Sequence, residues 1–394
     1  MSFFNTLPNN KIWIFKIFPV AIITALICAA YFFYSALLST YLQKNEILLI
    51  TLVYTALHII NMRSLFEGLY WMSSTICYQL AAILFFTMLG AAIRYMYKPS
   101  FLYGFMLLFC CLALPGTAEI ISPVLIITLT GFLFIYAKNK NKKIILIAIL
   151  VVFCAAIIVF LSPGNNNRVQ NDQHNYHPGL ITAVFYSLRA VCYYFLLWLV
   201  NPSNIFAVVL IELLLLRRIR TSFKFISTQK LLIAFISLIF LCATIYFPLF
   251  YFESSLPFPR VTTLVFFVGA HLFFIFLFLL LKKYQSFRFQ NKIFSFISQD
   301  QVNNHLTMLF FIFIFTSNNF ISVSKDVMSG TAYYFNKEAI ERFKSIRSCT
   351  SDTCHVSYYK DWPSSIEPFK KESDNSNPFI HVNKYFGKTI LYKK

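Results

Sequence analysis

The chain has 394 residues, of which 58% are hydrophobic and only 12% are charged, and its formal net charge is +19. A soluble protein of this length cannot bury so much apolar surface, whereas a lipid bilayer accepts it directly. The positive charges lie in short clusters that follow apolar runs, which is typical of cytoplasmic anchors. These features exclude a soluble globular domain and favour a multi-pass membrane protein that binds no nucleic acid.

Long apolar runs recur from the start of the chain to residue 321 and define the predicted membrane crossings. A single crossing needs about 20 apolar residues. Four runs of this kind, with almost no charge, are 13–38, 144–161, 231–250 and 261–281. The sequence therefore predicts an all-α polytopic membrane protein.

Basic residues between these runs indicate the orientation, because cytoplasmic loops of membrane proteins are enriched in Lys and Arg. Five such loops lie around Lys44, around Arg94, and at 138–143, 217–220 and 282–292. Counting between them predicts about ten crossings, with both ends of the chain on the outer side. Residues 1–321 form the predicted transmembrane domain of a protein in the bacterial inner membrane.

The segment from Gly179 to Leu216 joins an outer loop to an inner one, so it must cross the membrane an odd number of times. The sequence Asn201-Pro202-Ser203-Asn204 divides it into two apolar halves. Because Pro interrupts a helix, we expect the first half to lie at the outer interface or to re-enter, and the second to form one broken crossing.

Four of the six carboxylates in the first 299 residues share one kind of place, a short polar connector on the predicted outer side. These carboxylates are Glu67, Glu119, Asp172 and Glu253. Acids near lipid are costly and usually line a polar cavity or pathway. The pattern predicts an outward-facing polar site.

The first two connectors offer candidate bases and a sugar-stacking surface. Glu67 lies close to Tyr70 and Trp71, which combines a hydrogen-bonding acid with aromatic faces. The alternative is that these aromatic residues are anchors at the membrane boundary. Glu119 follows a Pro-Gly turn, and its alternative role is to oppose a helix dipole.

The third and fourth connectors carry cations suited to phosphate. Ser162-Pro163-Gly164-Asn165 continues to Asn167 and Arg168, and Glu253 is followed by Arg260. The asparagines supply amide donors and acceptors, and a guanidinium matches phosphate geometry. The alternative for the third connector is a solvated loop.

Residues 322–394 are predicted to form a small α+β extracytoplasmic domain. Asn336 could cap an amphipathic helix, and strands are expected at 353–359 and 389–392. Cys349 and Cys354 could form a disulfide there, while a metal site that adds His355 is a weaker reading. The other cysteines are expected to be small core residues, and the dispersed histidines, including His58 and His271, are expected to be satisfied or interfacial. No metal site is assigned.

The motifs in this order resemble an uncharacterised bacterial family of multi-pass membrane proteins. The resemblance covers nearly the whole chain. The matching elements are Tyr70-Trp71 with Tyr78, the turn from Gly116 to Glu119, Ser162-Pro163-Gly164-Asn165 with Arg168, Pro259-Arg260, and in the tail 326–330, Glu341-Arg342 and 384–387. That family in turn is similar to the membrane-embedded (GT-C type) glycosyltransferases.

The resemblance implies transfer of sugar from a polyprenyl-phosphate donor to a glycan or lipid acceptor at the outer face. Membrane lipid, the lipid-linked donor and the acceptor are then the partners. No cofactor is indicated, although a divalent metal is compatible with this chemistry. The implied roles are base for Glu67 or Glu119, phosphate binding for Arg168 and Arg260, phosphate or sugar binding for Asn165 and Asn167, stacking for Tyr70 and Trp71, and substrate contact for Glu253.

Such enzymes carry catalytic acids in a first outer loop after an N-terminal crossing, and this chain starts without either. An N-terminally truncated and inactive form is therefore one interpretation. A transporter or flippase of a lipid-linked glycan is another, and a non-catalytic scaffold is a third. A transporter should present polar groups through the bilayer midplane, whereas in this sequence they gather at one face.

Overall fold

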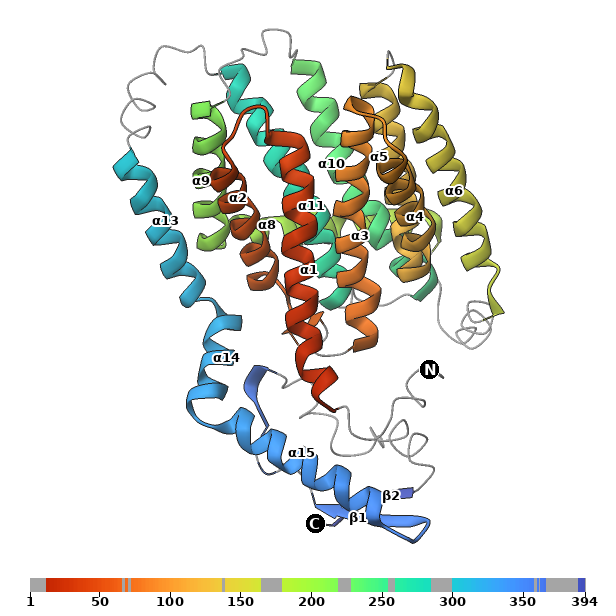
Figure 1. Cartoon of the computed structure of the whole chain (residues 1–394), viewed down its shortest axis with the longest axis vertical. Helices are drawn as coiled ribbons and strands as arrows, with labels where there is room; N and C mark the ends of the chain where they lie inside the picture. Colours follow the sequence, from red (N-terminus) through yellow and green to blue (C-terminus); the bar gives the residue numbers. More distant parts are fainter. Residues whose placement is uncertain are drawn as a thin grey trace. The chain divides into compact units, whose positions relative to one another are not determined.

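The computed structural model describes residues 12–65, 68–69, 72–136, 139–163, 179–218, 228–253, 259–284, 300–357, 360, 362–365 and 389–393. These residues are mostly helical (Figure 1). The chain divides into two compact units. The bundle unit comprises Pro19–Arg63 and Glu67–Ile314, and the tail unit comprises Met1–Phe18, Ser64–Phe66 and Phe315–Lys394.

The long helices up to the start of the tail unit follow the apolar runs of the sequence. They are α1 (Ile12–Leu38), α2 (Lys44–Ile60), α3 (Met72–Tyr97), α4 (Phe101–Thr117), α5 (Ser122–Ile135), α6 (Lys143–Phe160), α8 (Leu180–Leu199), α9 (Pro202–Arg218), α10 (Thr228–Pro248), α11 (Pro259–Tyr284) and α13 (Asp300–Phe315). Short helical turns are η3 (Glu119–Ile121), η4 (Lys140–Lys142) and η5 (Leu249–Glu253).

Within the described residues, five helices are long and apolar enough to cross a membrane. They contain the segments Ile17–Leu38, Ser74–Tyr97, Lys140–Phe160, Leu180–Leu199 and Arg260–Leu277. A sixth arises if α13 and the following α14, which meet at a bend of 57°, form one span. Helices α4, α9 and α10 and the η3–α5 pair contain shorter apolar stretches. The chain is therefore an α-helical membrane protein with several membrane-crossing helices.

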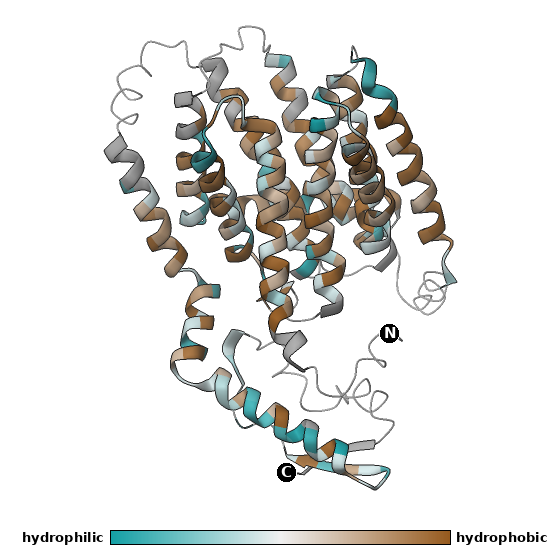
Figure 2. Ribbon diagram, in the orientation of Figure 1, coloured by the Kyte–Doolittle hydropathy of each residue, from teal (hydrophilic) through white to brown (hydrophobic). Residues whose placement is uncertain are grey.

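Apolar side chains on the outside of the bundle are consistent with contact to lipid. On α4, the exposed Phe101, Phe105 and Phe109 form a stripe in which successive ring centroids are 6.2 and 6.1 Å apart. Their four-residue spacing places them on one helix face. Figure 2 shows hydrophobic residues along the bundle helices, whereas α15 of the tail unit is mixed.

Helices α1 to α6 run alternately in opposite directions (Figure 1). The α2–α3 and α4–α5 turns and the end of α6 consequently lie at one end of the bundle, drawn lower in Figure 1. The opposite end carries Lys44, Arg94 and the basic turn Lys140–Lys142. The two classes of connector predicted from charge therefore lie at opposite ends.

Helix α8 departs from this alternation. It runs across its neighbours rather than along them (Figure 1), and it buries one narrow stripe, formed by Ala183, Ser187, Ala190, Val191 and Tyr194. The predicted break is confirmed, because α8 ends at Leu199 and α9 begins at Pro202. The Asn201 side chain accepts a hydrogen bond from the Ser203 backbone N–H at 3.0 Å, which starts α9.

The tail unit contains α14 (Asn318–Met328), α15 (Thr331–Ser348) and the parallel strands β1 (Thr353–Ser357) and β2 (Thr389–Lys393). The prediction that Asn336 caps the tail helix is wrong, because α15 already begins at Thr331. The reason is Gly330, whose φ of +74° separates α14 from α15. Cys349 and Cys354 are joined by the expected disulfide.

Asp326 ties α14 to a later segment of the same unit. Its carboxylate accepts hydrogen bonds from the Ser364 backbone N–H and hydroxyl, at 2.8 and 2.9 Å, and from the Ser365 backbone N–H at 2.8 Å. Desolvation alone would raise the pKa of Asp326, but these hydrogen bonds outweigh it and lower the pKa below its ordinary value.

Candidate functional site

Most of the predicted site residues lie outside the described residues. These are Glu67, Tyr70, Trp71, Asn165, Asn167 and Arg168, and the side chain of Glu253 is likewise not described. Glu119 is half-buried at the start of η3, and Arg260 is half-buried in the first turn of α11. The convergence of acids and arginines on one outer cavity stays a prediction.

A polar cluster joins the end of α2 to the break between α8 and α9. Asn61 Nδ2 donates to Asn204 Oδ1 at 2.7 Å, and Asn204 Nδ2 donates back to Asn61 Oδ1 at 3.1 Å. Asn204 Nδ2 also reaches the carbonyl oxygen of Trp198 at 2.8 Å. Asn201 Nδ2 lies 3.4 Å from Asn61 Oδ1. We call Asn61, Asn201 and Asn204 the asparagine cluster.

A cation lies two residues beyond Asn61. Arg63 is exposed, and its Nη1 donates to the hydroxyl of Tyr194 at 2.6 Å. Its guanidinium also lies 5.4 Å from the centroid of that ring. The centroids of the Tyr194 and Tyr246 rings are in turn 5.9 Å apart. Because one face of the guanidinium packs on an aromatic ring while the group stays accessible, Arg63 is prearranged to receive an anion.

An apolar groove of about 220 Å³ begins beside the asparagine cluster. Helices α2, α8, α9 and α11 form it. Its lining residues are Leu57, Phe195, Trp198, Leu199, Asn204, Ile205, Val208, Val209, Phe266, Ala270, Phe273, Phe274 and Leu277. Apart from Asn204 this lining is apolar and offers no partners for sugar hydroxyls, so the groove suits a hydrocarbon chain better than a sugar ring.

A larger but shallower apolar groove of about 700 Å³ lies along α4, between α3 and α6. Its lining includes Phe101, Phe105 and Phe109, which belong to the exposed stripe of α4. It has no polar cluster comparable to the asparagines among its described lining residues. We therefore regard it as ordinary lipid-facing surface.

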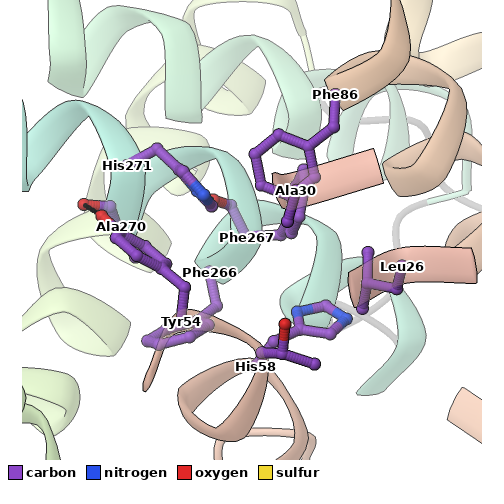
Figure 3. Close-up of a pocket in the computed structure, with 10 residues that line it drawn as sticks. Leu26, Ala30, Tyr54, His58, Phe86, Phe266, Phe267, Ala270 and His271 are labelled. Atoms are coloured by element: carbon purple, nitrogen blue, oxygen red, sulfur yellow. Dashed lines mark hydrogen bonds between the residues drawn. The ribbon is translucent and has the colours of Figure 1, made fainter. Parts of the chain in front are cut away.

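A second group of polar side chains is buried in the bundle core (Figure 3). The Tyr54 and His271 rings are stacked, with centroids 4.2 Å apart. Tyr34 lies 5.2 Å from Tyr54, also between ring centroids. Nε2 of His58 is 2.8 Å from Oε1 of Gln79. Helices α1, α2, α3 and α11 thus bring five polar side chains into a predominantly apolar interior.

Several atoms of this region have no hydrogen-bond partner among the described residues. They are Nδ1 of His58, Nε2 of His271 and both carboxylate oxygens of Glu212. Glu212 lies on α9, which packs against α2 and α11, and it is 3% exposed. We call Tyr34, Tyr54, His58, Glu212 and His271 the core cluster.

The core cluster was missed in the sequence. The acids predicted to be functional all lie in polar connectors, whereas Glu212 lies inside an apolar run. The two histidines were expected to be satisfied or interfacial. A lone acid in an apolar run is itself a functional signal, and it would have identified Glu212. The expectation that polar groups gather at one face is corrected by these buried residues.

Among the residues that the structure describes, no group of three or more His, Cys, Asp or Glu side chains is arranged to hold a metal. The alternative metal site at Cys349, Cys354 and His355 is wrong, because both thiols are consumed in the disulfide. No family model, curated protein or solved structure matches the chain.

Proposed function

We propose that the chain is a bacterial inner-membrane protein of the glycosyltransferase type that binds a polyprenyl-phosphate-linked sugar at its outer face. One observation supports this most strongly. An apolar groove beside α9 and α11 begins at a cluster of amides next to an exposed arginine. A long hydrocarbon chain attached to a phosphate has the same division between an apolar and an anionic part.

The prenyl chain lies in the groove in this proposal, in contact with Val208, Phe266 and Phe273. Its phosphate lies near Arg63 and Asn204, where the guanidinium and amide donors can meet the anionic oxygens. Arg168 and Arg260 would add charge, as expected from the third and fourth connectors. The apolar contacts supply affinity in proportion to area, and the cations distinguish the phosphate from an uncharged lipid.

Sugar transfer follows from the same arrangement. A carboxylate, Glu119 or Glu67, takes the proton of an acceptor hydroxyl, and that oxygen attacks the anomeric carbon of the donor sugar. The bond from this carbon to the phosphate oxygen breaks, and polyprenyl phosphate leaves with its charge held by the arginines. Asn165, Asn167, Tyr70, Trp71 and Glu253 orient the sugar.

The proposed topology has about ten crossings, with α8 at the outer surface and the tail unit extracytoplasmic. The separation of basic and acidic connectors to opposite ends of the bundle supports it. A reporter enzyme that works only outside the cytoplasm, fused after Lys394, should be active. Activity of a cytoplasmic reporter at the same position would overturn the orientation.

The groove is tested by filling it in the full-length protein reconstituted in lipid. Val209 is 38% exposed and lines the groove, so Val209→Trp should block it without disturbing the core. Leu197 on α8 is 46% exposed and lies outside the groove, which makes Leu197→Trp the matched control. Val209→Trp should weaken polyprenyl-phosphate binding about tenfold, the equivalent of 1.4 kcal/mol, and Leu197→Trp should not.

Polyprenol, which lacks the phosphate, should compete at least tenfold less well than polyprenyl phosphate. Arg63→Ala should remove most of that difference, whereas Arg63→Lys should retain part of it. Equal binding by Val209→Trp and the wild type would contradict the proposal. A sugar-transfer assay on the same samples shows whether the bound donor is also used in transfer.

A transporter or flippase of a lipid-linked glycan is a second candidate, and the core cluster favours it. Polar groups such as Glu212 and His58 lie in the interior of the bundle, and a pathway for a polar cargo needs such groups. Proteoliposomes loaded with a fluorescent lipid-linked glycan distinguish the two. Movement between leaflets without sugar transfer would favour the transporter.

A further inference from the structure

The core cluster is used by neither the groove nor the sugar chemistry, and it includes a carboxyl group in an unusual position. Glu212 lies between apolar neighbours on α9 and is 3% exposed. Neither of its oxygens has a hydrogen-bond partner among the described residues. An ionised carboxylate so placed has lost its hydration and gained no compensating cation, so its neutral form is favoured.

Other titratable side chains lie in the same bundle core. The Tyr54 and His271 rings are stacked, with centroids 4.2 Å apart, and His58 and His271 line one small cavity. The titratable side chains on the elements packed around this space are Tyr34 of α1, Tyr54 and His58 of α2, and His271 of α11.

A small cavity lies between the two imidazoles (Figure 3). Its volume is about 10 Å³, close to the space needed for a single water molecule. His58, His271, Tyr54 and Thr55 supply polar groups to its lining. The unpartnered Nδ1 of His58 and Nε2 of His271 provide the hydrogen-bonding capacity that a water molecule requires.

We propose that the core cluster is an intramembrane proton-binding site. Glu212 holds the proton: its carboxylate takes up one proton from water when the site fills, and its O–H bond breaks to return that proton when the site empties. The site does not depend on sugar transfer.

Infrared spectroscopy of the full-length protein in lipid tests where the proton lies. A protonated carboxyl has a C=O stretching band that a carboxylate lacks. At pH 7 the wild type should show this band, Glu212→Gln should lose it, and Glu341→Gln, which changes an exposed acid on α15, should keep it. If the band persists unchanged in Glu212→Gln, the proposal is overturned.

Transfer into D₂O gives a second readout, because replacing the carboxyl proton with a deuteron shifts the band. The wild type should show a band that shifts in D₂O, and Glu212→Gln should lack that shifting band.

Discussion

Replacing Asn204 with Ala should destabilise the bundle, because this side chain links α9 to α2 and α8. It is 8% exposed and makes three hydrogen bonds, two with Asn61 and one with the Trp198 carbonyl. Each such bond contributes about 0.5–1.5 kcal/mol net. Asn61 keeps its hydrogen bond to the Leu57 carbonyl. The free energy of unfolding should therefore fall by about 2 kcal/mol, which corresponds to the lower part of the range per hydrogen bond.

The assay is equilibrium unfolding in mixed micelles of mild detergent and dodecyl sulfate, followed by circular dichroism. Asn318→Ala, at an exposed position on α14, serves as the control and should stay within about 0.5 kcal/mol of the wild type. In the Asn61→Ala/Asn204→Ala double variant, the loss in free energy of unfolding should be about 1 kcal/mol smaller than the sum of the losses in the two single variants. Strict additivity, or a wild-type midpoint for Asn204→Ala, would refute the assigned pairing.

Three further outcomes are expected. Gly90→Val should destabilise the bundle by about 1–3 kcal/mol, because a Cβ at this position would lie 2.5 Å from a ring carbon of Phe32 on α1. Gly131→Ala, whose Cβ would meet nothing within 4 Å, should stabilise the bundle by about 1 kcal/mol through helix propensity. The same unfolding assay compares the two variants. In the wild type, ionised Asp326 stabilises the tail unit at pH values above the ordinary pKa of 3.8, and this stability is lost as the pH falls through the lowered folded-state pKa of Asp326. Asp326→Asn should remove this contribution, which is measured as the rate of proteolysis against pH. Reducing the Cys349–Cys354 bridge should cost the tail about 2 kcal/mol for so short a loop, and both thiols should resist alkylation in native membranes without reductant.

Charge and hydropathy were sufficient to predict the helical membrane class and the segregation of basic loops to one end. Both depend on solvation, which acts on each residue nearly independently of its tertiary neighbours. The break at Pro202 was also predictable, since a missing N–H is a local property of the backbone. The disulfide between Cys349 and Cys354 followed from spacing and compartment in the same way.

The asparagine cluster and the core cluster were not predictable by the same means. Asn61 and Asn204 are 143 residues apart, and Tyr54 and Ala270 are 216 residues apart. Which helices pack together depends on side-chain shape across the whole bundle, and no local pattern encodes it. Glu212 is different, because its isolation in an apolar run was visible and only its partners were not.

If a polyprenyl-phosphate donor lies in the groove beside α9 and α11 with its phosphate toward Arg63, its chain can be located chemically. The experiment is photolabelling of the full-length protein in lipid with a polyprenyl phosphate that carries a photoreactive group on its chain, followed by peptide mapping. Labels should concentrate on the peptides of Ile205–Val209 and Phe266–Leu277, and unlabelled polyprenyl phosphate should suppress them. Labels spread over the lipid-facing stripe of α4, or unaffected by the competitor, would contradict this placement.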